Sequence, residues 1–405
     1  MPATPQALLV GGARTPVGRY GGALASVRPD DLAALVVRHA VTDAGIDPHD
    51  VDEVILGNAN GAGEENRNVA RMAWLLAGFP DTVPGITVNR LCASGLSAII
   101  MASHMIKAGA ADIVVAGGVE SMSRAPWVME KPAKAFAKPG DVFDTSIGWR
   151  FTNPLLAARE KTTYSMPETA EELASVDGIT RDDADAFALR SHERALVAME
   201  AGRFDDEIVS VQVNRGRTSF AVDTDEGPRA ETTLAVLGGL RPVVRPGGIV
   251  TAGNSSSLND GASAVIVASE AALQRYGLTP RARILDGASA GVPPEIMGIG
   301  PVPATQKVLD RTGAGIADLG AVELNEAFAT QSLACIRRLG LDEEIVNRDG
   351  GAIALGHPLG SSGSRIAITL LGRMERELSG EARRLGLATM CVGVGQGTAM
   401  LLEGV

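Results

Sequence analysis

The heptapeptide Val51-Asp-Glu-Val-Ile-Leu-Gly57 has a counterpart in Leu319-Gly-Ala-Val-Glu-Leu-Asn325, 268 positions further along the chain (319 − 51 = 268). Two more pairs of landmarks share this offset. Gly45 and Gly313 are each expected to end a helix, and Ser94-Gly95 and Ser362-Gly363 are each expected to open one. A repeat at a fixed offset predicts two halves of similar structure. Catalytic residues from equivalent places in the two halves can then converge on one site.

Short apolar runs alternate with helix-length segments around these landmarks. The runs expected to be buried strands are Ala7–Val10, Val54–Leu56, Ile113–Ala116 and Leu387–Cys391. The segments expected to be helices are Asp31–Ala44, Gly95–Ala108, Ala329–Leu339 and Ser364–Glu377. This alternation predicts βαβ units and a largely parallel sheet that helices cover on both faces.

Residues 121–248 differ in character from the two halves. They contain a predicted helix at Asp182–Ala201, with Asp182 or Asp183 as the expected N-cap. Aromatic side chains such as Trp127 and Phe143 need packing partners, so we expect an inserted loop domain rather than a free linker. The expected boundaries are 1–120 (completed by 249–275) for the first half, 121–248 for the insertion and 276–405 for the second half. The run Lys131, Lys134 and Lys138 is interpreted as a solvated face, with phosphate contact as the alternative.

The composition excludes several classes of function. The chain has 405 residues and a net charge of −11, and 3% of its residues are aromatic. A nucleic-acid-binding protein needs basic residues that contact phosphates and aromatic rings that stack on bases. This acidic chain with few aromatic residues is a poor candidate for that function. The segment Met1–Val10 lacks a basic region, and no apolar stretch of about 18 residues occurs, so we expect a cytoplasmic protein without a signal peptide or membrane span.

The segment Asn89-Arg-Leu-Cys-Ala-Ser-Gly95 places Cys92 just before an apolar helix. A thiol at a helix N-terminus meets the positive end of the helix dipole and free N–H groups, which stabilise the thiolate and lower the thiol pKa. Cys92 is therefore a candidate nucleophile, and a buried packing cysteine is the alternative. Cys335, within the predicted helix Ala329–Leu339, is interpreted as core.

Three further segments carry polar groups where strands or tight turns end. His357 lies in a glycine-rich turn before a helix, which suggests a backbone shaped for a ligand rather than a core histidine. Cys391 ends a predicted strand and runs into alternating glycines, whose N–H groups can hold an oxyanion. Asn325 ends another strand, where sites of α/β proteins usually form, and helix capping is its alternative role.

Together these segments resemble the thiolase family, whose members read close to N-x-x-C-x-S-G, N-E-A-F-A, G-G-A-I-A-x-G-H-P-x-G-x-S-G and C-x-G-x-G-Q-G. The four patterns occur here in that order, at 89–95, 325–329, 350–363 and 391–397. Further matches are Arg14-Thr-Pro16, 117–123 and 250–261. The resemblance covers essentially the whole chain. It implies an α/β thiolase fold: two similar βαβαβαββ halves packed as a five-layer α-β-α-β-α sandwich, with an inserted loop domain.

The resemblance also implies roles for individual residues. Cys92 is implied to be the acylated nucleophile, His357 its activating base, and Cys391 the acid/base at the α-carbon of acetyl-CoA. The N–H groups of Cys92 and Gly393 are implied to form one oxyanion hole, and His357 with a water held by Asn325 a second. The residues implied to contact the substrate coenzyme A are Met166, Arg229, Ala252, Ser256, Met297 and Phe328. No metal or prosthetic group is implied, and the usual assembly is a homodimer or homotetramer.

Among thiolases, the chain looks most like β-ketoadipyl-CoA thiolases over the segments 63–71, 145–151, 165–171 and 391–395. The implied reaction is 3-oxoadipyl-CoA plus CoA giving succinyl-CoA and acetyl-CoA, by a ping-pong mechanism through acyl-cysteine. Many acetoacetyl-CoA thiolases carry His-Met in place of Ser165-Met166, and glycine in place of Val394. A dicarboxylic substrate needs a cation for its distal carboxylate, and our hypothesis is Arg150, in the run Trp149-Arg150-Phe151.

The alternatives within the family are an acetoacetyl-CoA thiolase and a general 3-ketoacyl-CoA thiolase of β-oxidation. A non-catalytic thiolase-fold protein that binds lipids or CoA would be expected to lack a catalytic Cys or His. A decarboxylating condensing enzyme of this fold pairs its Cys with two His, or with His and Asn, and lacks the C-terminal Cys. The presence of Cys92, His357 and Cys391 argues against both.

Overall fold

The strands of the two halves form one continuous hydrogen-bonded sheet in the computed structural model. The structure describes residues 5–380 and 384–405. Residues 1–4 of the predicted N-terminal segment therefore lie outside the described residues. The order along the sheet is β12-β13-β14-β11-β1-β10-β5-β3-β4, and β2 pairs with β10. These strands are β1 (Leu8–Arg14), β2 (Gly18–Arg19), β3 (Glu53–Gly57), β4 (Gly85–Val88), β5 (Ile113–Ser121), β10 (Asn259–Ala268), β11 (Ala282–Gly291), β12 (Leu319–Leu324), β13 (Leu385–Val392) and β14 (Gln396–Gly404). The halves meet where β1 pairs with β11.

The prediction of a largely parallel sheet is wrong. Parallel pairing joins β3 to β4 and β5, and β12 to β13, whereas the other neighbouring strands of this sheet run antiparallel. Residues 393–395 alone connect β13 to β14, and so short a link can join only antiparallel strands. β10 returns from the insertion to lie antiparallel between β1 and β5.

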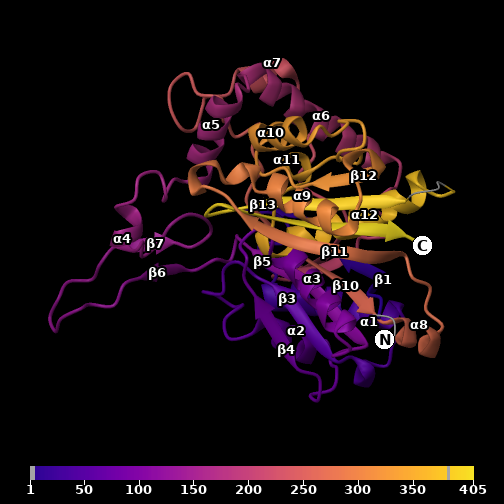
Figure 1. The fold of residues 1–405 in the computed structure, drawn as a ribbon. Coiled ribbons are helices and arrows are strands. Elements are labelled where there is room, and N and C mark those ends of the chain that lie inside the picture. The colour runs from indigo at the N-terminus through magenta and orange to yellow at the C-terminus, as the bar shows by residue number, and fades with distance from the viewer. Residues whose placement is uncertain (1–4, 381–383) are drawn as a thin grey trace.

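Helices complete five layers around the strands (Figure 1). α1 (Pro29–Asp43) and α2 (Val69–Leu76) cover the outer face of the first half, and α9 (Pro301–Thr312) and α10 (Ala329–Leu339) cover that of the second. α3 (Ser94–Lys107) and α12 (Leu359–Glu377) lie between the halves, where Leu96 and Ile366 belong to one apolar core. The predicted α-β-α-β-α sandwich is confirmed.

The repeat landmarks have clear structural equivalents. Gly45 and Gly313 end α1 and α9, and both adopt the left-handed conformation with φ of 65° and 69°. α3 begins at Ser94 as its sequence predicts, whereas α12 begins at Leu359, five residues before the predicted Ser364. α10 spans the predicted residues, and Cys335 is buried within it.

α3 and α12 approach each other backbone to backbone at equivalent glycines. A Cβ atom on Gly95 would lie 2.7 Å from the carbonyl oxygen of Gly360. A Cβ atom on Gly363 would lie 2.2 Å from the backbone nitrogen of Leu96. Any larger side chain would force the two helices apart, so the Ser-Gly pairs of the repeat set the spacing between the halves.

The insertion adds elements outside the five layers. They are β6 (Trp127–Met129), β7 (Val142–Asp144), α4 (Pro154–Ala157), α5 (Met166–Asp177), α6 (Arg181–Glu200), β8 (Val211–Arg215), β9 (Thr218–Val222) and α7 (Leu234–Gly238). Short helices elsewhere are α8 (Glu270–Tyr276), α11 (Ala352–Leu355), η1 (Pro48–Asp50), η2 (Pro294–Ile299) and η3 (Ile316–Asp318). Within the described residues, no helix has the length and apolar character needed to cross a membrane.

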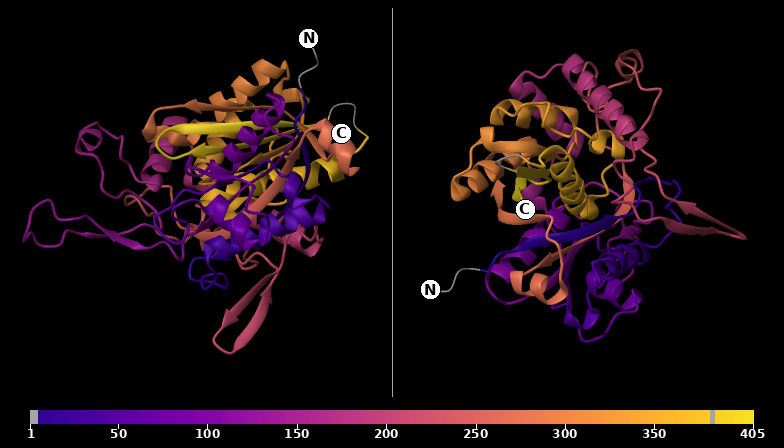
Figure 2. Two further views of the ribbon diagram at one scale, coloured as in Figure 1. Left: turned by 90° about the horizontal axis from the view of Figure 1, so that it is seen from below. Right: turned by 90° about the vertical axis from the view of Figure 1, so that its right-hand side faces the viewer.

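The β6–β7 hairpin extends away from the body (Figure 1 and Figure 2). Trp127 on this hairpin is 76% exposed, so the packing expected of it is absent, whereas the rings of Phe143 and Phe151 lie 5.2 Å apart. The predicted N-cap of α6 is also wrong. Thr180 caps this helix and Asp183 completes its capping box, because an N3 carboxylate can bond back to the N-cap backbone.

We expect Gly363→Ala to lower the free energy of unfolding by about 1–3 kcal/mol, because the new methyl group collides with the α3 backbone. Urea unfolding followed by circular dichroism measures the loss. Gly372→Ala in the same helix is the matched control, since its Cβ would meet only the flexible end of Arg376. Equal stability of the two variants would contradict the proposed role of the glycine contact.

Candidate active site

Three residues from distant parts of the chain line one cavity of about 350 Å³, here called the central cavity: Cys92, His357 and Cys391. Cys92 precedes α3, His357 lies between α11 and α12, and Cys391 lies at the end of β13. Five of the six residues implied to contact coenzyme A line the same cavity: Met166, Ala252, Ser256, Met297 and Phe328.

Polar side chains of the same motif hold the turn that carries Cys92. Asn89 Oδ1 accepts the N–H of Leu91 at 2.8 Å, and Ser94 Oγ donates to the carbonyl oxygen of Leu91 at 2.7 Å. Leu91 has a φ of 47°, which non-glycine residues rarely adopt. Such strained residues cluster at functional sites, where the surrounding structure fixes them.

The hydrogen bonds of His357 define its tautomer. Ser362 Oγ donates to the carbonyl oxygen of Pro358 at 2.9 Å, so it accepts from His357 Nδ1–H at 2.6 Å. The other ring nitrogen, Nε2, therefore carries a lone pair. Asn259 Oδ1 fixes the backbone by accepting the His357 N–H at 2.9 Å.

Asn325 lies behind His357 rather than in the cavity lining. Its Nδ2 is 3.4 Å from His357 Nε2, and its backbone N–H donates to the carbonyl oxygen of Thr389 at 3.0 Å. The side chain is fully buried, and its Oδ1 has no hydrogen-bond partner among the described residues. A buried amide oxygen in this state is suited to accept a hydrogen bond from water or substrate.

Burial sets the charge of the central cavity. It raises the pKa of Cys92 to about 11, although the N–H groups of Gly393 and of Cys92 itself act to lower it. The N–H donors thus act in the expected direction, but burial outweighs them and the pKa of Cys92 lies above its ordinary value. Burial, then Arg365, lowers the pKa of His357 to about 3. The site thus holds a neutral thiol beside a neutral imidazole.

Cys391 is buried more deeply than Cys92. Burial raises its pKa well above the ordinary value, and Cys92 and Cys335 raise it further. The Cys391 thiol therefore stays protonated in the free protein. A protonated thiol at the cavity wall is a group that can give a proton to a carbanion.

A second cavity of about 190 Å³, here called the side cavity, also reaches Cys92. It shares Cys92, Ile147, Met166 and Leu359 with the central cavity. Its other lining residues include Asn60, Thr145, Trp149, Arg150, Tyr164, Gly393 and Val394. Cys92 thus stands where two cavities meet.

Arg229, the sixth residue implied to contact coenzyme A, lies in a third cavity of about 390 Å³. That cavity shares four lining residues with the central one: Ala252, Ser255, Ser257 and Leu258. Arg19 lines it as well. Two cations therefore border a space that continues into the central cavity.

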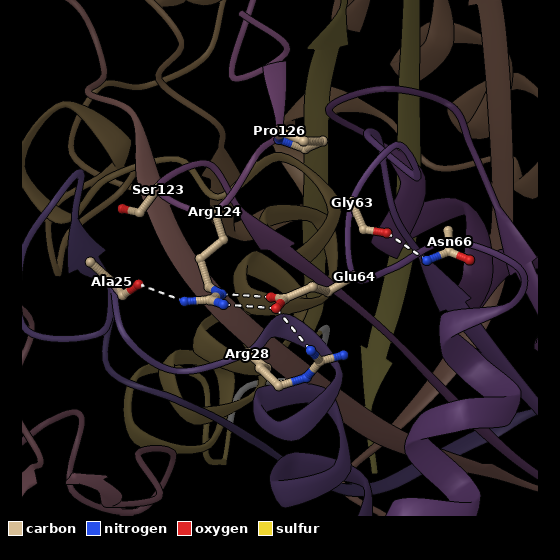
Figure 3. A pocket seen from close by; sticks show the side chains of 8 residues that line it. All are labelled: Ala25, Arg28, Gly63, Glu64, Asn66, Ser123, Arg124 and Pro126. Carbon is tan, nitrogen blue, oxygen red and sulfur yellow. Dashed lines mark hydrogen bonds and ion pairs between the residues drawn. The ribbon is translucent and has the colours of Figure 1, made fainter. Parts of the chain in front are cut away.

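Another surface depression, lined by Arg28, Glu64 and Arg124, carries cations that are already paired. Figure 3 shows both guanidinium groups directed at the Glu64 carboxylate. Because both guanidinium groups pair with Glu64, we interpret this cluster as structural rather than as a binding site for an anionic ligand. Among the described residues, no group of three or more His, Cys, Asp or Glu side chains is arranged to hold a metal ion.

Comparison with known proteins identifies the family. Residues 7–271 match the family described as "Thiolase, N-terminal domain", and residues 278–404 match "Thiolase, C-terminal domain". The chain belongs to the thiolase family. Thiolases are acyltransferases, and this thiolase is therefore an enzyme of that class.

This thiolase is 54% identical over 404 residues to the 3-oxoadipyl-CoA/3-oxo-5,6-dehydrosuberyl-CoA thiolase of Escherichia coli K12, covering 99% of this chain and 100% of that protein. It is 54% identical over 398 residues to the β-ketoadipyl-CoA thiolase of Pseudomonas aeruginosa, covering 97% of each. The crystal structure of the Bacillus anthracis acetyl-CoA acetyltransferase matches with a TM-score of 0.93 and 42% identity, covering 100% of both chains. These matches confirm the predicted thiolase fold.

Several residues of the site were not singled out from the sequence of this thiolase. Ser362 and Asn259 form hydrogen bonds with His357. Both residues belong to sequence segments that match the family, so a search of those segments for hydrogen-bonding partners of the histidine could have found them. Asn60 and Thr145 line the side cavity from separate loops. Thr145 opens the segment 145–151 that indicated the subfamily, but no local signal in the sequence marks either residue as part of a cavity.

We expect alkylation of Cys92 by iodoacetamide to accelerate about tenfold per pH unit between about pH 7 and about pH 9. The pKa of about 11 lies above this range, so the thiolate fraction rises throughout it. His357, with a pKa of about 3, stays neutral over this pH range, so its titration adds no inflection to the plot of alkylation rate against pH. Mass spectrometry of the Cys92 peptide over a pH series measures the rate. A plateau beginning near neutral pH would instead indicate a thiolate–imidazolium pair.

Proposed function

We propose that this thiolase cleaves 3-oxoadipyl-CoA with coenzyme A, giving succinyl-CoA and acetyl-CoA. The observation that carries the proposal is the 54% identity, over nearly the whole chain, to relatives named 3-oxoadipyl-CoA or β-ketoadipyl-CoA thiolase. The acetyl-CoA acetyltransferase of Bacillus anthracis is less similar, at 42% identity. Ser165 and Val394, where this chain differs from many acetoacetyl-CoA thiolases, both line the side cavity. These two differences also support the dicarboxylic substrate.

In the first half-reaction, His357 Nε2 takes the proton of the Cys92 thiol. The thiolate attacks the 3-keto carbon, and the bond between C2 and C3 breaks. Acetyl-CoA leaves as an enolate, and Cys391 gives its thiol proton to C2. The lone pair on Nε2 and the protonated Cys391 support these roles.

In the second half-reaction, Cys391 takes the proton of an incoming CoA thiol, and the CoA thiolate attacks acyl-Cys92. The Cys92 thiolate leaves and recovers its proton from His357. The N–H groups of Cys92 and Gly393, which both act on the Cys92 sulfur, form the oxyanion hole for this step. His357 and a water held by Asn325 Oδ1 form the hole for the enolate. One such preorganised donor contributes roughly 10²- to 10³-fold in rate.

The proposed ligand path follows the cavities. Coenzyme A extends from Cys92 through the central cavity, past Met297 and Phe328, towards Arg229 in the third cavity. The phosphates of coenzyme A are anionic, so a cation at the far end supports this direction. The acyl group lies in the side cavity.

The domain division and the assembly are also proposals. The first half comprises 1–120 with 249–275, the insertion 121–248 and the second half 276–405, which the place of β10 between β1 and β5 supports. The proposed assembly is a homodimer or homotetramer. The exposed rings of Trp127 and Phe136 on the β6–β7 hairpin support a contact there.

We expect kcat/KM for 3-oxoadipyl-CoA to exceed that for acetoacetyl-CoA by about tenfold or more, because a matched polar group discriminates more strongly than chain length alone. A thiolysis panel of acetoacetyl-CoA, 3-oxoadipyl-CoA and a long-chain 3-oxoacyl-CoA tests this with the purified enzyme. If kcat/KM were highest for acetoacetyl-CoA, the protein would be an acetoacetyl-CoA thiolase. A maximum for the long-chain substrate would indicate a general β-oxidation thiolase.

We expect Cys391→Ala to lower kcat for thiolysis by about 10²-fold or more, because it removes the acid/base group. Acylation of Cys92 should persist, since His357 remains to activate it. Mass spectrometry after incubation with acetyl-CoA detects the adduct, and Cys92→Ala is the control without one. Loss of the adduct in Cys391→Ala, with unfolding excluded by circular dichroism, would assign Cys391 to the acylation step instead.

A further inference from the structure

Arg150 is the one charged side chain among the described residues that line the side cavity. The wall around it is formed largely by uncharged groups, such as Ile147, Trp149 and Met166. A guanidinium group keeps its charge at any physiological pH. Arg150 is partly exposed, so water and protein groups share the donors of its guanidinium group.

The partner of this cation is an amide rather than a carboxylate in the described part of the chain. Arg150 Nη2 donates to Asn60 Oδ1 at 3.0 Å. The buried Glu120 also acts on Arg150 electrostatically, but its oxygens are occupied. They accept N–H groups of Ala59 at 2.9 Å, Asn60 at 3.1 Å and Gly360 at 2.8 Å. Arg150 thus retains donors for a further acceptor.

The Asn60 side chain is held in one orientation. Its Nδ2 donates to both the carbonyl oxygen and Oγ1 of Thr145, each at 3.0 Å, and Thr145 is itself buried. The amide oxygen of Asn60 must therefore face Arg150. One edge of the guanidinium group is fixed in this way, which preorganises the rest for a ligand.

We propose that Arg150, positioned by Asn60, binds the terminal carboxylate of the acyl chain and selects acyl-CoA substrates with an anionic end. This inference rests on the proposed function, since it assigns the residue that recognises the dicarboxylic substrate. Cys92 and Arg150 line the same cavity, so an acyl chain attached to Cys92 can extend towards Arg150. A guanidinium group binds a carboxylate through two parallel hydrogen bonds, which a neutral chain end cannot form.

The test compares three substrates: 3-oxoadipyl-CoA, its terminal methyl ester and acetoacetyl-CoA. We expect Arg150→Met to lower kcat/KM for 3-oxoadipyl-CoA on the order of 10²-fold, as loss of one partner of a charge pair does. The values for the ester and for acetoacetyl-CoA should change by less than about threefold. Arg150→Lys should recover part of the loss. Arg159→Met, an exposed arginine outside the cavity, is the matched control.

Asn60→Asp provides a second, independent variant. It places a carboxylate against Arg150, which should neutralise the cation and repel the substrate carboxylate, and it removes the Nδ2 donor to Thr145. The kcat/KM for the ester reports the effect of these lost hydrogen bonds, and the ratio of acid to ester reports the effect of the charge. The selectivity for acid over ester should therefore fall in both Arg150→Met and Asn60→Asp.

Two results separate the inference from the proposed function. A wild-type enzyme without preference for 3-oxoadipyl-CoA over acetoacetyl-CoA overturns the proposed substrate. A wild-type preference that survives in Arg150→Met, or a loss of equal size for all three substrates, overturns the role of Arg150 alone.

Discussion

The backbone contact between α3 and α12 is the constraint on which the site depends. Gly95 and Gly363 carry no side chain at the crossing, so the two helices approach more closely than bulkier residues would allow. Cys92 precedes one helix and His357 precedes the other. The proposed nucleophile and base therefore belong to separate halves, and neither half alone contains all residues of the proposed site.

Burial keeps Cys92, His357 and Cys391 uncharged before the reaction. The two thiols have raised pKa values and the imidazole a lowered one, so the reacting groups are neutral when the substrate arrives. In the proposed mechanism, charge develops only during the reaction, on the sulfur atoms of Cys92 and Cys391, on His357 and on the oxygen atoms of the substrate. Fixed N–H donors act more strongly in a buried site than in bulk water, because fewer water molecules compete with them.

The sequence predicted those parts of the fold whose causes are local. α10 and the ends of α1 and α9 follow from apolar periodicity and from glycines with positive φ. Strand direction could not be predicted in the same way, because it depends on which segments meet across the sheet. The motifs pointed to Cys92, His357 and Cys391, which the structure gathers at one cavity. The pKa of Cys92, however, depends on burial that no motif displays. The hydrogen bond between Asn60 and Thr145 could not be predicted from the sequence, because two separate loops bring these residues together.

The junction of two cavities at Cys92 has a consequence for flux. On the proposed chemistry, the acyl group stays in the side cavity while acetyl-CoA departs and coenzyme A enters through the same passage. The acyl-enzyme is then a shared form for which free coenzyme A and its acetylated product compete. Turnover therefore responds to the ratio of these two metabolites, and abundant acetyl-CoA holds the enzyme back whatever the supply of 3-oxoacyl substrate.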